Sequence, residues 1–256
     1  MASMSWHTYD HYGYALVAVL GTFLAVAFVA WLMQRSRWAG WVGSLQGVAP
    51  PFINIIGVLF GLTLAFLAND TWSAHDRAMG AVYREADALR VLFSLSGKLG
   101  EPVRGRLRTS IGDYARASAG EWPQLAQRSA SQEVADRADG LLTLLASREV
   151  EAAAGANVQA LMLKKASEIR DDRDLRIALS QTHVNPLKWL GMAFLGLLTL
   201  VSVAVVHADR PRAALVAVIL FALAAAPTAA IVLVQGNPFQ QPSSVTPAPI
   251  EAAAGV

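Results

Sequence analysis

Four long apolar stretches dominate the pattern of hydrophobic and polar positions along the chain. They comprise residues 12–33, 48–68, 187–206 and 213–234, and the one charged side chain within them is Lys188, near the start of the third. An α-helix needs about 20 apolar residues to cross a hydrocarbon core about 30 Å thick. The pattern therefore predicts four transmembrane helices, with both ends of the chain on the same side of the membrane.

The segment between the second and third stretches has a different pattern. Apolar residues such as Leu89, Leu92 and Phe93 recur at spacings of three and four, and charged residues fall between them. This is the period of amphipathic α-helices rather than of strands. Helix-breaking residues at three points divide the segment into four helical stretches, which predicts a small helical bundle with charged outer faces.

The junction between the second apolar stretch and this bundle contains no helix breaker. Asp70 is followed by neither proline nor glycine until Gly80. Both residues are the strongest local signals for the end of a helix. We therefore expect the second span to continue out of the membrane as one long helix.

Together these patterns predict an all-α integral membrane protein with four transmembrane helices and an amphipathic bundle inserted between the second and the third. Residues 1–70 hold the first helix pair, residues 71–186 the aqueous bundle, and residues 187–235 the second helix pair. Residues 236–256 are rich in Pro, Ser and Ala and have no period. Such a composition predicts an extended tail.

The composition agrees with a membrane protein. Hydrophobic residues make up 54% of the chain and charged residues 16%, which is too apolar for an ordinary soluble domain. The formal net charge is only +2, and no basic block predicts binding to nucleic acid. The sequence contains no cysteine, which excludes disulfides and thiolate chemistry.

Known catalytic signatures are missing from the sequence. It has no His-Glu-x-x-His motif, phosphate-binding loop, nucleophile elbow or dinucleotide fingerprint. We therefore expect neither an enzyme nor a cofactor. His7 and His11 have the spacing of a helical metal-ligand pair, but no third ligand accompanies them, and the aromatic residues around them equally suit a membrane interface. No metal site is expected.

The orientation in the membrane is argued from basic residues in the short loops. Arg35 and Arg37 follow the first span, and Arg210 and Arg212 precede the fourth. Lysine and arginine in short loops favour the cytoplasmic side, whereas those in long segments count for little. This predicts that the bundle and both termini are extracytoplasmic.

Small and polar residues form a seam along the second span. They fall three or four positions apart, so they share one face of a helix: Asn54, Gly57, Gly61, Ala65 and Asn69. Such seams let helix backbones approach closely in membranes, within one subunit or between subunits. The alternative is that the seam forms part of a pore wall.

A row of bulky apolar residues runs beside this seam. Ile56, Phe60 and Leu64 are four apart and would form a constriction if the same helix from several subunits surrounded an axis. Hydrophobic rings gate channels by dewetting. Just beyond the span, His75 and Arg77 are candidates for a pore mouth, where histidine would respond to pH and arginine would attract anions. The alternative is a solvated helix face.

Two features of the predicted bundle, Glu85 and the Glu121-Trp122-Pro123 sequence, are interpreted as structural. Glu85 lies on the apolar side of its predicted helix, and a buried carboxylate needs a basic partner. Arg173 and Arg176 are the candidates. The Glu121-Trp122-Pro123 sequence is interpreted as a helix end followed by a new helix, with the indole packed beneath the bundle and proline in the first turn. A partner-binding corner is the alternative.

Four segments carry a resemblance to a known family. They are "VLFGLTLAFLANDTW" (58–72), "READALRVLF" (84–93), "EWP" (121–123) and "NPFQQPSSVTP" (237–247). With the two-span, insert, two-span order, the chain resembles the bacterial bestrophin-like domain of unknown function and, more distantly, the bestrophins, which are oligomeric anion channels. The resemblance implies a multi-pass protein of the bacterial inner membrane that forms a homo-oligomer and passes inorganic ions such as chloride. In bestrophins the insert is cytosolic, and phenylalanine stands at the neck position held here by Leu64.

Two functional hypotheses follow. The first is a homo-oligomeric, anion-conducting channel in which the second span lines the pore and Ile56, Phe60 and Leu64 form its hydrophobic neck. The second is a membrane-anchored interaction or sensory protein, whose bundle binds a partner while the spans anchor and assemble it. Several copies in contact around an axis would favour the first, and a simple pair the second.

Overall fold

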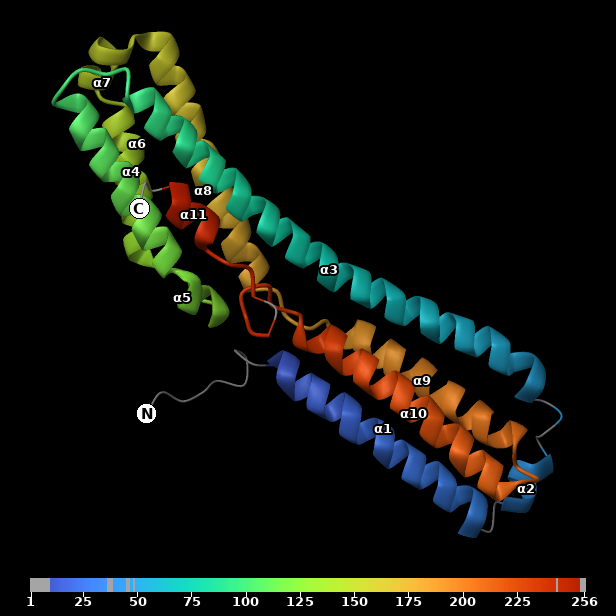
Figure 1. Ribbon diagram of the computed structural model, residues 1–256. Helices are drawn as coiled ribbons and strands as arrows, with labels where there is room; N and C mark the ends of the chain where they lie inside the picture. Colours follow the sequence, from blue (N-terminus) through green and yellow to red (C-terminus); the bar gives the residue numbers. More distant parts are fainter. Residues whose placement is uncertain (1–9, 36–38, 45–46, 48, 243, 254–256) are drawn as a thin grey trace, which may run out of the picture. The chain divides into compact units, whose positions relative to one another are not determined.

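The computed structural model describes residues 10–35, 39–44, 47, 49–242 and 244–253. All regular secondary structure in these residues is helical, which confirms the all-α prediction (Figure 1). The helices are α1 (Asp10–Arg35), α2 (Ala39–Ser44), α3 (Ala49–Ser96), α4 (Val103–Gly120), α5 (Trp122–Ala126), α6 (Gln132–Leu145), α7 (Arg148–Ala154), α8 (Ala156–Ser180), α9 (Pro186–Val206), α10 (Pro211–Val234) and α11 (Ala248–Ala253).

The chain forms two compact units. The first, here called the membrane unit, comprises Met1–Trp72 and His183–Gly236. The second, the bundle unit, comprises Ser73–Thr182 and Asn237–Val256. The residues that follow the last span therefore fold with the inserted bundle rather than standing apart as a separate segment.

Among the residues that the structure describes, four helices of the membrane unit are long and apolar enough to cross a bilayer: α1, the first part of α3, α9 and α10. This agrees with the four spans that the sequence predicts. Alanines on α10 allow close packing, because Ala222 is fully buried and Val218 nearly so against Val26 and Val29 of α1. The large apolar side chains on the outer faces remain exposed within the chain, as expected for surfaces that meet lipid.

Local sequence explains where the last two spans begin. Proline occupies the first turn of both α9 and α10, where its missing N–H costs nothing. At α9 the Asn185 side chain caps the helix, because its Oδ1 accepts hydrogen bonds from the backbone N–H groups of Leu187 and Lys188 at 3.0 and 3.3 Å.

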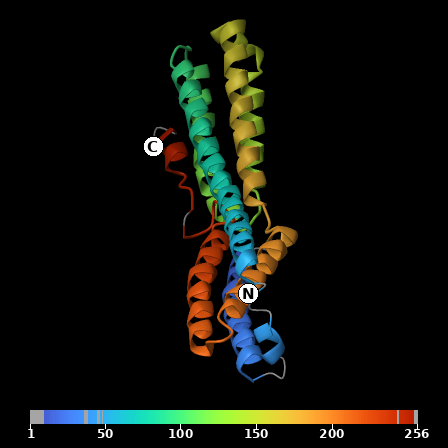
Figure 2. The same cartoon turned by 90° about the vertical axis from the view of Figure 1, so that its right-hand side faces the viewer.

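Helix α3 runs for 48 residues without interruption, as predicted from the lack of a helix breaker after Asp70 (Figure 2). Its first half belongs to the membrane unit and its second half to the bundle unit. The change of environment follows the sequence, since the continuous apolar run gives way to an amphipathic pattern. On the second half, Leu89 and Leu92 are fully buried whereas Arg90 is exposed.

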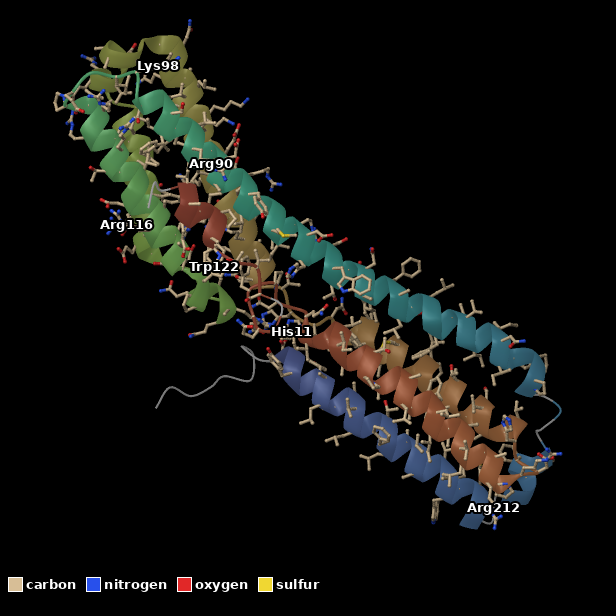
Figure 3. All side chains as sticks on the ribbon, viewed as in Figure 1. His11, Arg90, Lys98, Arg116, Trp122 and Arg212 are labelled. Carbon is tan, nitrogen blue, oxygen red and sulfur yellow. The ribbon has the colours of Figure 1, made fainter. Side chains whose placement is uncertain are left out.

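The bundle unit packs the second half of α3 with α4, α6 and α8, while the short α5 and α7 connect them. One residue from each longer helix illustrates its core: Leu89, Leu107, Leu145 and Met162 are all fully buried. Charged side chains cover the outside, including the labelled Arg90, Lys98 and Arg116 (Figure 3). This is the amphipathic arrangement that the helical spacing predicts.

The end of the chain differs from the predicted extended tail. Residues after 236 pack on the bundle unit, and the last of them form α11. Phe239, Val245 and Ile250 are buried there. The sequence of the tail shows no helical period because most of the tail has no regular secondary structure. Its few apolar residues nevertheless pack into the core of the bundle unit, against α4 and α5.

Candidate functional site

The predicted seam on α3 is uncovered within the single chain. Asn54, Gly61, Ala65 and Asn69 are exposed, and Gly57 is half-buried. A methyl group added at Gly57 or Gly61 would meet no atom within 4 Å. The glycines therefore do not mediate close packing between helices of one subunit, and this face is available to another copy of the chain, to lipid or to a pore.

The bulky row faces the chain's own spans. Ile56, Phe60 and Leu64 are all half-buried. The Phe60 ring lies 5.6 Å from that of Phe221 on α10, and a Cβ at Gly196 on α9 would lie only 3.1 Å from it. Leu64 packs against a cluster that contains residues of α9 and α10. Phe60 therefore packs α3 against α9 and α10.

The polar end of this span is tied to its neighbours. The Asp70 carboxylate pairs with Lys188 of α9, with Oδ2 2.7 Å from Nζ. The Trp72 indole donates a hydrogen bond of 3.1 Å to the Gln235 side-chain oxygen just after α10. Both contacts are exposed, so each contributes little stability alone. They connect the end of the apolar part of α3 to the start of α9 and to the residue that follows α10.

The two predicted mouth residues lie on the part of α3 that belongs to the bundle unit. His75 is half-buried, and Arg77 is exposed. Arg77 donates from Nε to the Ser73 carbonyl oxygen of its own helix at 3.2 Å. Within the described ranges it has no acidic partner, so its charge remains available to ions in solution.

A buried ionic cluster occupies the middle of the bundle unit. The Glu85 carboxylate on α3 receives hydrogen bonds from Arg176 on α8, with Nε 2.8 Å from Oε2 and Nη2 3.0 Å from Oε1. Tyr114 and Ser118 on α4 also donate to Oε1, both at 2.8 Å. Of the two arginines that the sequence offers as partners for Glu85, the fold selects Arg176.

The other arginine pairs with a residue of the Glu-Trp-Pro sequence. Arg173 Nη2 lies 2.6 Å from Glu121 Oε1, and it also donates to the Ser131 carbonyl oxygen at 2.9 Å. Glu121 in turn accepts from the Ser131 backbone N–H at 2.9 Å. Sequence reasoning missed this role of Glu121, because the helix break there removes the periodicity that would have placed it inside.

Trp122 packs against the Arg176 side chain of this cluster. Its ring lies 4.8 Å from the Arg176 guanidinium carbon, a cation–π geometry. Its indole nitrogen donates to the Val245 carbonyl oxygen at 2.6 Å, and its ring meets Phe239 edge-on. Pro123 lies in the first turn of α5. The predicted buried indole and helix restart are therefore both present.

The electrostatics of the cluster follow from this geometry. Burial and the neighbouring Glu85 carboxylate raise the pKa of Tyr114 well above its usual value of 10.0. For Arg176, burial acts to lower the pKa, but the electrostatic interactions with Glu85 and Tyr114 and the hydrogen bonds to Glu85 outweigh it, so the pKa is raised. The cluster contains two acids and two arginines, so each buried charge has a partner of opposite sign.

The described residues contain no group of three His, Asp or Glu side chains that could hold a metal ion. His7 lies outside those residues. His11 is buried, and its ring occupies the space where Gly236 would carry a Cβ.

The family of the chain follows from comparison with known proteins. A family model described as the Bestrophin-like domain matches residues 20–250. The chain belongs to this family. The match includes all four candidate spans in whole or in part, together with the inserted bundle and the segment that docks on it. No match was found among curated proteins.

Solved structures share the fold of this Bestrophin-like chain. Among them is a crystal structure of a bacterial bestrophin homologue from Klebsiella pneumoniae with one tryptophan replaced by alanine. It has a TM-score of 0.68 at 12% identity and covers 95% of this chain and 93% of the other. A variant of the same homologue with a tyrosine replaced by alanine gives 0.61 at 15% identity, with 94% and 93% covered. The likeness establishes a common fold for a membrane protein.

Proposed function

We propose that this chain is the subunit of a homo-oligomeric ion channel of the bacterial inner membrane, with α3 lining the pore. The observation that carries the proposal is the family match over nearly the whole chain. Bestrophins, which the chain resembles, are oligomeric anion channels. The uncovered face of α3 supports the same conclusion, because it carries amides and glycines that neither lipid nor a monomer requires.

Two faces of α3 are candidates for the pore lining. The row Ile56, Phe60 and Leu64 would form a hydrophobic neck that gates by dewetting. Its contacts with α9 and α10 leave it less accessible within one subunit than the seam. The seam runs from Asn54 to Asn69 and offers side-chain amide donors that can replace part of an anion's hydration shell.

Cysteine substitution distinguishes these faces, because the natural chain contains no cysteine. Purified protein in liposomes should carry a current. A charged thiol reagent added to Gly61→Cys or Ala65→Cys should block that current if the seam lines the pore. The same reagent on Phe60→Cys or Leu64→Cys should block it if the row forms the neck.

Leu16→Cys is the matched control, since Leu16 is exposed on α1. Its modification should leave the current unchanged. The channel proposal is abandoned if liposomes containing folded wild-type protein pass no current. If cross-linking through Gly57→Cys and Gly61→Cys joins only pairs of chains, the anchored interaction protein becomes the better description.

Anion preference is the second part of the proposal. Arg77 is exposed without an acidic partner among the described residues, and His75 lies half a turn away on the same helix. A basic residue near a pore mouth raises the local anion concentration. In chloride gradients, Arg77→Glu should shift the reversal potential toward cations relative to wild type, whereas Arg90→Glu, on the same helix, should not.

The orientation proposed from the short loops places the bundle outside the cytoplasm. Arg212 lies in the first turn of α10, at the end of one of these loops (Figure 3). A cysteine introduced at the exposed Lys98 tests this in intact cells. Labelling by a membrane-impermeant reagent supports an extracytoplasmic bundle, and labelling only after cell lysis supports the cytosolic arrangement of bestrophins.

A further inference from the structure

An apolar cavity of about 340 Å³ lies within the membrane unit. All four candidate spans contribute to its wall. Small residues form much of it, including Ala18 and Gly21 on α1, Gly196 on α9 and Ala225 on α10. Phe60 and Phe221 supply its bulky part. The cavity exists because small side chains face one another there, and a Cβ at Gly21 would meet no atom within 4 Å.

The lining offers a water molecule the acceptor capacity of one hydroxyl and no other polar side chain. Among the residues that form it, Thr22 alone carries a polar side chain, and its hydroxyl already donates to the Ala18 carbonyl oxygen at 2.7 Å. A buried water needs two to four polar partners, and apolar cavities without them remain dry. An aqueous ion or a polar ligand is therefore a poor occupant.

The position of the cavity limits the occupants further. Gly21 lies near the middle of the span Asp10–Met33, and Gly196 near the middle of Pro186–Val206. In a bilayer this depth corresponds to the hydrocarbon core. The chemical species present there are lipid acyl chains and the helices of neighbouring protein copies.

The walls of the cavity separate these two occupants. Four helices of one chain line the cavity, so an occupant has to enter between packed helices. A single acyl chain is slender enough to do so, whereas an α-helix with its side chains is about 10 Å wide. The cavity is more than twice the size of the roughly 150 Å³ apolar cavity that holds benzene, so about a dozen acyl carbons fit on that scale.

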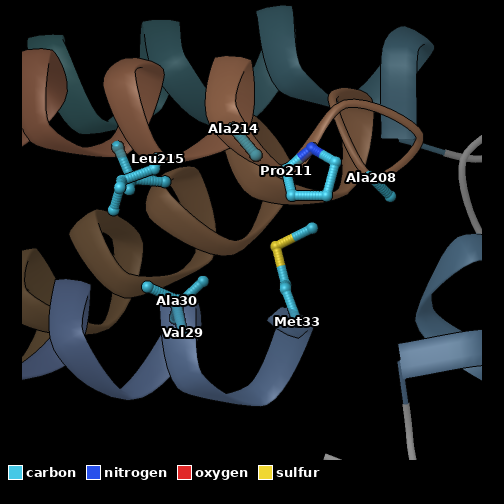
Figure 4. Close-up of a pocket in the computed structure, with 8 residues that line it drawn as sticks. Val29, Ala30, Met33, Ala208, Pro211, Ala214 and Leu215 are labelled. Atoms are coloured by element: carbon cyan, nitrogen blue, oxygen red, sulfur yellow. The ribbon is translucent and has the colours of Figure 1, made fainter. Parts of the chain in front are cut away.

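A second pocket in the same unit provides a contrast. It lies between the end of α1 and the start of α10, beside Met33 and Pro211, and its volume is only about 10 Å³ (Figure 4). That space is at the lower limit for a single water molecule. The larger cavity is therefore not a general consequence of loose packing throughout the unit.

We propose that the cavity between α1, α9 and α10 binds one acyl chain of a membrane phospholipid. The chain enters from the bilayer beside Gly21, which is exposed, and contacts the Phe60 and Phe221 rings. Because Phe60 also connects α3 to the other spans, the bound chain would support the packing of α3. This inference requires Phe60 to face α9 and α10 rather than a pore, and it does not require the protein to conduct ions.

The test uses the full chain in vesicles of phosphatidylethanolamine and phosphatidylglycerol, doped with a phosphatidylglycerol that carries a diazirine in the middle of one acyl chain. After illumination, mass spectrometry locates the adducts. Adducts should concentrate on residues of the cavity wall such as Ala225 and Ala229. Gly21→Phe and Ala193→Phe, which fill the cavity from α1 and from α9, should each reduce these adducts about tenfold, as expected when overpacking works against the bound chain.

Leu16→Phe is the matched control, because it adds the same ring to an exposed position on α1 that does not line the cavity. It should leave the adduct pattern unchanged. The proposal would be overturned if the adducts in the wild type were spread evenly over all exposed apolar residues. It would also be overturned if neither filling variant reduced the adducts. Efficient cross-linking of Gly21→Cys to a second copy of the chain would overturn it as well, since a partner's side chain would then fill the space. If one filling variant fails to fold, the other variant and the wild-type map still decide.

Discussion

Arg176 and Glu85 form an ion pair in which both side chains are completely buried, with Nε 2.8 Å from Oε2. The pair joins α8 to α3 across 91 positions of sequence. Burying two charges is unfavourable unless each is paired and hydrogen-bonded. Here Tyr114 and Ser118 satisfy the remaining capacity of the carboxylate, so the pair holds three helices in one arrangement.

Removing the charge of Glu85 should strongly destabilise the bundle unit. Glu85→Gln leaves two buried arginines, Arg173 and Arg176, with one buried acid, Glu121, and an uncompensated buried charge costs about 3–5 kcal/mol. The measurement is the free energy of unfolding in detergent, followed by helicity against denaturant. Asp87→Asn is the control, since Asp87 pairs with Arg90 on an exposed face of the same helix, and it should cost at most about 0.5 kcal/mol.

The double variant Glu85→Gln with Arg176→Met should be more stable than Glu85→Gln alone, because no buried charge then lacks a partner. If the single and double variants are equally destabilised, the pair does not act through its charge, and our account of the cluster is wrong.

Stability should fall at alkaline pH because of Tyr114. Burial and Glu85 raise its pKa in the folded state above the usual 10.0, so above that pH the folded state holds a proton that the unfolded state has lost. The contribution is fully present below about pH 10 and is lost as the pH rises through the folded-state value. Unfolding midpoints should therefore decrease less steeply above about pH 10 in Tyr114→Phe than in wild type.

Tyr83→Phe is the matched control, because Tyr83 is exposed on α3. It should retain the wild-type slope. Equal slopes for wild type and Tyr114→Phe would mean that Tyr114 ionises as easily in the folded as in the unfolded state, contrary to its buried environment.

The docking of the chain's end should depend on the Trp122 indole. Trp122→Phe keeps an aromatic ring but leaves the Val245 carbonyl oxygen without its donor, which costs about 1–3 kcal/mol for a buried group. Limited proteolysis should then cut between Phe239 and Ile250 faster than in wild type. Trp72→Phe removes an exposed indole hydrogen bond instead, and it should leave the rate of cleavage there unchanged.

The spans and the long α3 could be predicted because they depend on composition within one stretch of chain. The apolar run before Asp70 and the amphipathic pattern after it needed no knowledge of neighbours, and neither did the need of Glu85 for a basic partner. The choice between Arg173 and Arg176 was not accessible in this way, since the two arginines are three positions apart and share almost the same face of α8.

The seam on α3 also shows which features the sequence predicts and which depend on the fold. Its residues share a helix face by their spacing alone, but spacing does not say which face of the helix meets α9 and α10. The Phe60 contacts with Gly196 and Phe221 decide that. The bulky row therefore packs inward within the chain, and the seam is left uncovered.

The sequence by itself determined the all-α class, the four apolar helices, the continuity of α3 and the presence of buried charges, because helical period and hydrophobicity are properties of neighbouring residues. Only the tertiary structure decided which arginine neutralises Glu85, where the end of the chain docks beneath Trp122, and which side of α3 remains open. Those outcomes depend on contacts between residues far apart in sequence, whose free energies are determined by packing and desolvation in the folded protein.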